Sequence, residues 1–379
     1  MFLGLSMLIL MMAFVVNKGK ISVRIGRYHI WSVAFAGFAV VSGLWATYSF
    51  SASLASASLL FLTFICAAMV YIYYQDRMDA STLFSAVMWS GYVVAIYTLI
   101  YYGYDTLTQM AVESSERMEN EYANVNNIGM MAALSCVLQV NALFNKRNRW
   151  SAIMMIPAVI VIAATQSRKA FVMLIGGALV VALLKSLQSK NKGKALLRFV
   201  AVTVVAILAL RYLLELPIFG GVLERMEGLL ENLSGAGEGG ASSAMRARMR
   251  ELGWELFLEH PIAGVGLNNP QYFAAVRLMF QSYLHNNYVE ILAAGGTLGF
   301  LLYYSAHAYI LINLFKYRKA DPNAFIMGIV WMGIILVMDY GMVSYTDKSH
   351  IFYMMIQFLN VEIMKRKYRS MNYGSEKIH

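Results

Sequence analysis

A histidine that opens an apolar run is the residue of this sequence best suited to acid–base chemistry. His285 begins the segment HNNYVE, with Asn286 beside it and Glu290 about one helical turn further on. A neutral imidazole removes a proton from a hydroxyl group when it acts as a general base, and the two neighbours are placed to orient the ring. A lone histidine at a helix end more often makes an ordinary hydrogen bond, so both interpretations stay open. The other histidines lack comparable neighbours and are interpreted as structural: His29, His260, His307, His350 and His379.

Three arginines precede this histidine in the sequence, at Arg246, Arg248 and Arg250. The first and third are four residues apart and share a helix face, whereas Arg248 points elsewhere. Planar guanidinium groups bind phosphate oxygens through paired hydrogen bonds. The segment therefore suits a phosphate ligand, although a solvated helix face paired with Glu251 and Glu255 explains it equally well.

A second pair of cations, Arg168 and Lys169, lies in the segment TQSRKA at 165–170, between two apolar runs with almost no loop. The alternation of apolar runs places this hairpin at the external membrane face, where cations are disfavoured. Two fixed cations on that side indicate an anion site. Snorkelling of both side chains to lipid head groups is the alternative.

The elements that position these residues are membrane-spanning helices. Hydrophobic residues make up 59% of the 379 positions and charged residues 14%, too little charge for a soluble chain of this length. A span needs roughly 20 mainly apolar residues, which predicts an all-α integral membrane protein with about 11 spans in one polytopic domain, 1–379. The run 2–17 lacks a basic n-region and a cleavage site, so it is interpreted as a retained span. The candidate spans are 2–17, 29–49, 56–74, 81–102, 126–144, 150–166, 169–188, 198–216, 286–314, 323–342 and 350–365.

The net charge of +10 comes from basic residues whose positions indicate the orientation of the chain in the membrane and do not indicate nucleic-acid binding. Basic residues gather in short segments between apolar runs, as cytoplasmic anchors do. This places the C-terminus in the cytoplasm and residue 1 outside. The basic segments are 18–27, 146–149, 185–198, 316–319 and 365–369.

Two long connections are expected to be external: an acidic loop at 103–125 and a large loop at 217–285. Within the larger one, the Gly/Ser-rich stretch 234–243 predicts a flexible segment. Residues 245–260 approach helical spacing of apolar side chains, which predicts an amphipathic helix at the membrane surface. Pro261 ends that helix.

Together these segments resemble the O-antigen polymerase and O-antigen ligase family of bacterial membrane glycosyltransferases. The resemblance covers roughly residues 120–300 and lies in TQSRKA, in R-x3-W-x5-HP-x2-GVG from Arg250 to Gly266, and in HN-x3-E-x4-G-x3-G from His285 to Gly299. Three arginines stand where the family typically has one key arginine. The spacing to the tryptophan favours Arg250, but Arg246 and Arg248 remain open.

The resemblance implies glycosyl transfer from an undecaprenyl-diphosphate-linked oligosaccharide at the external face of the bacterial inner membrane. In that reaction His285 deprotonates the acceptor hydroxyl, and direct displacement inverts the anomeric configuration. Arg250, Arg168 and Lys169 offset the charge of the diphosphate leaving group, so no cofactor and no metal ion is expected. Membrane lipid and a chain-length regulator protein are further partners, and nucleic acid is not. Asn286, Glu290, Arg246 and Arg248 complete the substrate-binding residues.

Polymerisation of lipid-linked repeat units of an O-antigen, capsule or exopolysaccharide is the first interpretation. The alternative is an O-antigen ligase that transfers glycan to lipid A-core, because the same residues serve both reactions. A membrane transporter is a more distant alternative, since transporters frequently carry inverted repeats and no such repeat is found. A purely structural scaffold does not explain the HNxxxE segment at a membrane boundary.

Overall fold

The computed structural model describes residues 23–76, 79–112, 125–144, 149–189 and 241–376, with scattered positions within 7–15 and 191–204. Most of the expected spans 2–17 and 198–216 lies outside the described residues, as do 217–240 of the large loop and 113–124 of the acidic loop. The first part of the acidic loop is helical, because α5 (Tyr104–Val112) continues the chain directly after α4 (Ser81–Tyr102).

The all-α prediction is confirmed in the described ranges, where every regular element is a helix. Seven helices are long and apolar enough to cross a membrane, and each corresponds to a predicted run. The remaining elements are short or carry polar residues. The elements besides α4 and α5 are α2 (Arg27–Ser42), η1 (Gly43–Trp45), α3 (Phe50–Tyr74), α6 (Val125–Phe144), η2 (Arg149–Met154), α7 (Met155–Ala164), α8 (Arg168–Leu187), α11 (Ala241–Glu259), α12 (Pro270–Leu278), α13 (Asn287–Tyr317), α14 (Pro322–Gly341) and α15 (Lys348–Glu376).

The predicted count of about 11 spans is not confirmed. The run 150–166 forms a shorter helix that begins with six 3-10 residues, Arg149–Met154. The run 350–365 forms part of α15, which is long but is not among the sufficiently apolar helices. Its polar residues Gln357 and Asn360 are fully buried. A helix that is surrounded by protein can carry more polar side chains than one that faces lipid, because its polar groups find partners within the protein. This explains why the sequence of α15 is only weakly apolar.

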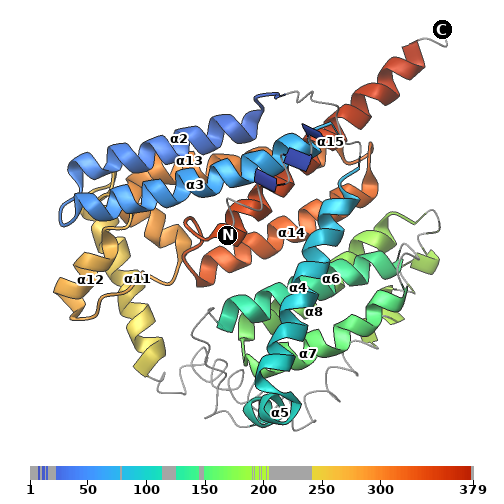
Figure 1. Ribbon diagram of the computed structural model, residues 1–379, viewed down its shortest axis with the longest axis horizontal. Coiled ribbons are helices and arrows are strands. Elements are labelled where there is room, and N and C mark those ends of the chain that lie inside the picture. Colours follow the sequence, from blue (N-terminus) through green and yellow to red (C-terminus); the bar gives the residue numbers. More distant parts are fainter. Residues whose placement is uncertain are drawn as a thin grey trace. The chain divides into compact units, whose positions relative to one another are not determined.

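The chain divides into two units, the first made of residues 1–80, 240–328 and 335–379 and the second of 81–239 and 329–334. In the first unit α2, α3, α13 and α15 pack side by side (Figure 1). Aromatic rings fill the space between these helices: Trp31 stacks on Phe35 with centroids 6.0 Å apart, and Phe35 lies 5.1 Å from Tyr303. This packing fixes α13 against α2 at Tyr303.

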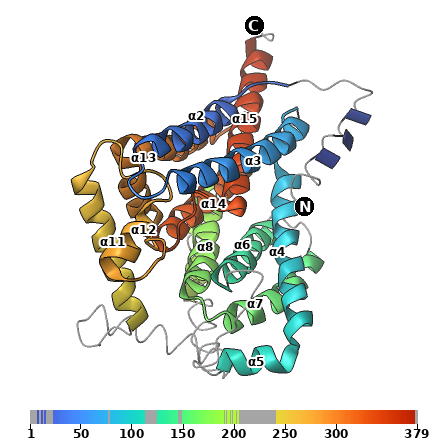
Figure 2. The same ribbon diagram turned by 60° about the vertical axis from the view of Figure 1, so that its left-hand side comes forward.

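In the second unit α4, α6, α7 and α8 form a bundle (Figure 2). Small residues lie where its helices cross. A Cβ on Gly91 would lie 2.6 Å from the carbonyl oxygen of Met131, and one on Gly177 would lie 2.7 Å from a methyl of Val137. Helices in membranes approach closely at such residues.

Helix α13 is broken at Gly296, whose φ of 60° and ψ of −161° are not helical. The break leaves main-chain N–H and C=O groups of α13 without partners inside the helix. The segment 261–266, which follows α11, forms hydrogen bonds with these groups before and after Gly296. A Cβ on Gly264 would lie 2.4 Å from the carbonyl carbon of Ala294, so only glycine fits there. The bonds run from Val265 N–H to Ala293 O (2.9 Å), Gly266 N–H to Ala294 O (2.9 Å), Thr297 N–H to Pro261 O (2.8 Å) and Leu298 N–H to Ile262 O (3.1 Å).

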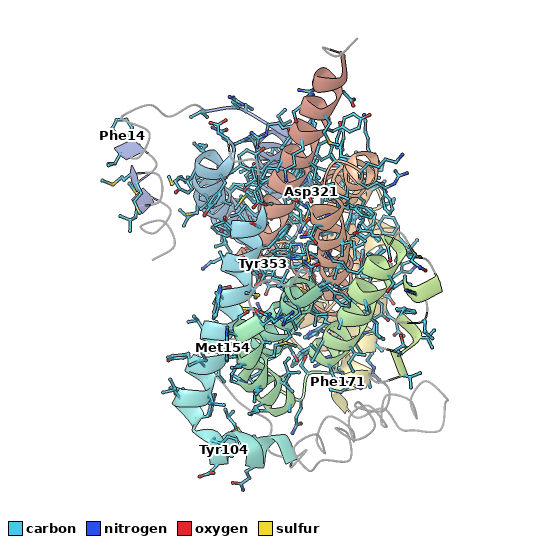
Figure 3. All side chains as sticks on the ribbon, turned by 90° about the vertical axis from the view of Figure 1, so that its right-hand side faces the viewer. Phe14, Tyr104, Met154, Phe171, Asp321 and Tyr353 are labelled. Carbon is cyan, nitrogen blue, oxygen red and sulfur yellow. The ribbon has the colours of Figure 1, made fainter. Side chains whose placement is uncertain are left out.

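Basic residues that lie before α2, between α13 and α14, and late in α15 come together at one end of the helices of the first unit. Arg24 pairs with Asp76 at 3.3 Å, and Lys367 pairs with Asp321 at 2.5 Å. Asp321 lies alongside the C-terminal part of α15 in Figure 3. Because α13 runs from Asn287 to its own basic end at Lys316 and Arg318, the HN segment lies at the opposite end of this unit.

Candidate active site

The predicted helix at 245–260 is present as α11, but its apolar face is covered by protein. Met249, Leu252 and Leu256 are buried against α12, α13 and the connections between them. The face that we expected to rest on the membrane surface is therefore occupied. Leu258, an apolar residue of the same predicted helix, is 65% exposed, and Trp254 is also exposed.

Helix α11 crosses the start of α13 at Gly253. A Cβ at this position would lie 2.5 Å from side-chain carbons of both Leu284 and Val289, the residues that flank the HN segment. Arg250 lies three residues before Gly253 and Arg246 seven, so all three share one stripe of the helix. Both arginines are half-buried, whereas Arg248 is exposed and lies on a different side. The structure thus brings two of the three candidate arginines to the side of α11 that meets the HN segment.

Tyr283 connects the arginine stripe with the histidine. Its ring centroid lies 4.3 Å from that of His285. Burial raises the pKa of the Tyr283 phenol, while the nearby Arg246 guanidinium opposes that rise. The nearby Glu290 carboxylate, in contrast to Arg246, raises the pKa of the Tyr283 phenol. A cation, an imidazole and a carboxylate therefore share one neighbourhood in the first unit.

His285 is half-buried and occupies a left-handed turn, with φ of 56°, directly before α13. The residues on each side of it are fixed. Glu290 is buried and accepts the main-chain N–H of Leu284 at 2.8 Å. Asn286 caps α13 by accepting the N–H of Val289 at 3.1 Å. Asn286 and Glu290 were expected to orient His285, and both hold the main chain around it.

Asn287 is the centre of a hydrogen-bond network in this region, called the Asn287 hub below. It was not predicted from the sequence. Its side-chain oxygen accepts the N–H groups of Ser344 and Tyr345 at 3.0 and 3.1 Å, and its amide donates to the Tyr304 hydroxyl at 3.1 Å. Tyr304 in turn donates to Asp339 at 3.0 Å. This network ties the connection after α14 to the start of α13. The signal in the sequence is Asp339, an acidic residue inside the apolar run 323–342. Ionisable residues in such runs usually pair with other polar groups inside the protein and often mark a functional site.

Arg168 and Lys169 belong to the second unit, where they are the first two residues of α8. Ser167 caps the helix by accepting the N–H of Ala170 at 3.4 Å. Gln166 takes a left-handed conformation, with φ of 47°, and donates to the Met110 carbonyl at 2.8 Å. Both cations are half-buried. They add to the positive end of the helix dipole, an arrangement that favours a bound anion.

Within the described ranges, side chains able to bind a metal ion gather at His307, Asp339 and His350. One carboxylate and two imidazoles differ from the oxygen-rich set that Mg²⁺ prefers. The group lies in the first unit and reaches the HN segment through Tyr304 and Asn287.

Residues 152–304 match a protein-family profile described as O-antigen ligase. The matched range contains every candidate residue of both units, from Arg168 to Glu290, and the glycines of the α13 break. A search of curated proteins finds no significant match to the chain.

Proposed function

We propose that this chain polymerises lipid-linked oligosaccharide repeat units, a proposal supported by the match of residues 152–304 to a profile described as O-antigen ligase. The donor is a glycan on undecaprenyl diphosphate, and the acceptor is a second lipid-linked repeat unit. A polyprenyl donor resides in the bilayer, which suits a chain with seven helices able to cross it. The reaction takes place at the external face of the plasma membrane, and a chain-length regulator sets the product distribution.

His285 is the proposed general base. The acceptor hydroxyl oxygen attacks the anomeric carbon of the donor while the bond from that carbon to the diphosphate breaks. The hydroxyl proton passes to the His285 imidazole, and the bonding electrons leave with the diphosphate. A single displacement of this kind inverts the anomeric configuration. The observation that carries the proposal is the half-buried His285, held in its turn by Asn286 and Glu290 beside the arginine stripe.

Arginine and lysine side chains are proposed to stabilise the negative charge that grows on the diphosphate. Arg250 and Arg246 share the stripe of α11 that meets the HN segment. Arg168 and Lys169 supply a second pair of cations at the start of α8. Guanidinium groups bind phosphate through two parallel hydrogen bonds, and so provide the charge that a catalytic Mg²⁺ would otherwise supply.

The distribution of charge along the first unit supports an external site. The basic residues before α2, between α13 and α14, and late in α15 gather at one end, as cytoplasmic anchors do. The HN segment lies at the other end, beyond the start of α13. This arrangement supports an external position for the proposed base, where a donor that has crossed the membrane would be accessible.

A reconstituted assay tests the proposal. The purified full-length chain is mixed with undecaprenyl-diphosphate-linked repeat units, and the products are resolved by size. We expect a ladder of polymer that persists in EDTA, because cations of the protein neutralise the leaving group. A product that forms only when lipid A-core is supplied would establish the ligase instead, which is the reaction named by the matching family profile. Absence of any glycosidic product with both acceptors would contradict the proposed function.

A further inference from the structure

Three buried ionisable side chains from three helices meet inside the first unit. His307 lies on α13, Asp339 near the end of α14 and His350 near the start of α15. One nitrogen or oxygen of each lies within 4.8 Å of those of the other two. The exposed fraction is 2% for His307, 1% for His350 and 0% for Asp339. Sequence spacing gives no hint of this group, because its members are far apart along the chain.

The two imidazoles do not complete their hydrogen bonds within the protein. His307 lies near the carbonyl of Tyr303 one turn earlier, yet neither of its ring nitrogens has a hydrogen-bond partner. His350 accepts or donates one bond with the Tyr303 hydroxyl, at 3.0 Å from Nε2, and its Nδ1 has none. A buried polar atom without a partner is unfavourable, because it has lost its hydrogen bonds to water and gained none in return. Of these unpartnered nitrogens, Nε2 of His307 lies 3.9 Å from the Asp339 carboxylate, which points to a ligand between them that an imidazole nitrogen binds.

Asp339 supplies negative charge at the same place. Its carboxylate accepts hydrogen bonds from the hydroxyls of Ser344 and Tyr304. The nearest basic nitrogens are Nε2 of His307 and Nε2 of His350, each 3.9 Å from a carboxylate oxygen. Burying a carboxylate is costly unless a cation accompanies it. A metal ion between the three side chains would satisfy the charge and the imidazole nitrogens together.

We propose that His307, Asp339 and His350 bind one divalent transition-metal ion, with Zn²⁺ as the best match to the donor set. Two imidazoles and a carboxylate are ordinary zinc ligands, with bonds of about 2.0–2.2 Å that place neighbouring donors roughly 3.3 Å apart in a tetrahedron. The two separations of 3.9 Å, each to a different oxygen of Asp339, need to close by about 0.6 Å. All donor atoms lie within 4.8 Å of one another, so the widest separation closes by at most about 1.5 Å.

The surrounding hydroxyls complete such a site. Tyr304 and Ser344 already donate to Asp339 and fix the orientation of its carboxylate, as outer-shell partners of metal ligands do. When Nε2 of His350 binds the ion, it gives up its 3.0 Å hydrogen bond with the Tyr303 hydroxyl. The ion would join α13, α14 and α15 directly beneath the Asn287 hub. Its role is structural, so this proposal does not depend on the glycosyl transfer proposed above.

Metal analysis of the purified full-length chain tests this site. The protein is isolated in detergent through an affinity tag without histidine, and its metals are measured by mass spectrometry. We expect about one zinc per chain in the parent and less than about a tenth of that in His307→Gln and in Asp339→Asn. The matched control is His260→Gln, because His260 is exposed on the loop after α11 and should leave the zinc content unchanged.

Two results would overturn the proposal. One is a parent chain without any divalent transition metal after growth in zinc-supplemented medium, which would leave the three side chains as a hydrogen-bonded network. The other is full metal content in both His307→Gln and Asp339→Asn. If these variants do not accumulate, the parent produced in cobalt-supplemented medium decides: the visible absorption bands of tetrahedral Co²⁺ support the site, and their absence contradicts it.

Discussion

The carboxylate of Glu290 accepts the main-chain N–H of Leu284 at 2.8 Å, so that a side chain in the first turn of α13 holds the residue directly before His285. Replacement of Glu290 by Ala leaves a buried N–H group without its acceptor, which costs about 1–3 kcal/mol. The turn that carries His285 then loses its fixed position. We expect kcat to fall about tenfold to a hundredfold with little change in the KM for the lipid-linked donor.

Glu290→Gln is the matched variant, because its side-chain oxygen still accepts the Leu284 N–H. It should recover most of the lost kcat in the same polymerisation assay. Equal and severe losses in Glu290→Gln and Glu290→Ala would instead show that the negative charge of the carboxylate is needed.

Removal of the proposed base tests the mechanism itself. His285→Ala should lose about 10²–10⁴ in turnover, the usual contribution of general-base catalysis, while donor binding persists. His285→Gln should be almost as poor, because an amide does not accept the proton usefully. In the parent, activity should fall on the acid side as the imidazole becomes protonated. Normal polymer from purified His285→Ala would refute this mechanism, although residues 152–304 would still match the O-antigen ligase profile.

The arginine stripe makes a prediction that separates Arg250 and Arg246 from Arg248. Arg250→Ala should abolish polymer while the protein remains in the membrane, and Arg250→Lys should retain a little activity because lysine lacks the planar fork. Arg248→Ala should have little effect, since that side chain is exposed on another side of α11. If Arg250→Ala is active, Arg246→Ala becomes the decisive variant.

In the second unit, Arg168→Ala should likewise remove polymer without loss of the protein. The measurement is polymer length and amount in membranes that contain equal protein. Normal polymer from both Arg168→Ala and Arg250→Ala would contradict the proposal that these cations bind the diphosphate.

Cysteine labelling tests the orientation of the chain. A cysteine at Ala244, an exposed position at the start of α11, should react with an impermeant reagent in intact cells. A cysteine at Lys319, between α13 and α14, should react only after lysis. The native Cys66 and Cys136 are buried and should give little background. The reverse pattern would place the candidate site in the cytoplasm and exclude the proposed donor.

The glycines of the α13 break predict a loss of folding. Gly264→Ala would place a Cβ 2.4 Å from the Ala294 carbonyl carbon at a φ of +66°, so we expect destabilisation of roughly 3 kcal/mol or more. The matched control is Gly333→Ala on α14, where nothing lies within 4 Å of an added Cβ. The measurement is the thermal unfolding temperature in detergent. Equal stability of the two variants would contradict the tight pairing at the break.

The sequence predicted the helical class, the ranges of seven apolar helices and the segments that carry the candidate residues. It did not predict α12, which is held by distant partners. Phe273 packs on Tyr48 with ring centroids 4.6 Å apart, and Arg277 donates two hydrogen bonds to Glu259 at 2.8 Å. Local periodicity contains no information about such contacts.

The same limit explains why Asn287 and Asp339 were missed. Asn287 looks like one more polar residue beside His285, and its importance arises only because the chain returns to it at Ser344 and Tyr345. Asp339 joins His307 and His350 only after three helices have packed. The HN and GVG motifs were found because their residues are close in sequence, whereas the pairing of one motif with the other is a property of the folded chain.

The break at Gly296 also bears on how the chain enters the bilayer. All 31 residues of α13 as one straight helix would measure about 46 Å, against roughly 30 Å for a hydrocarbon core. The half from Thr297 to Tyr317 alone rises about 31 Å and is sufficient to cross. The half that follows His285 is therefore not needed to cross the hydrocarbon core. Residues 261–266 leave the ribosome before α13, so partners for its interrupted hydrogen bonds already exist when that helix is inserted.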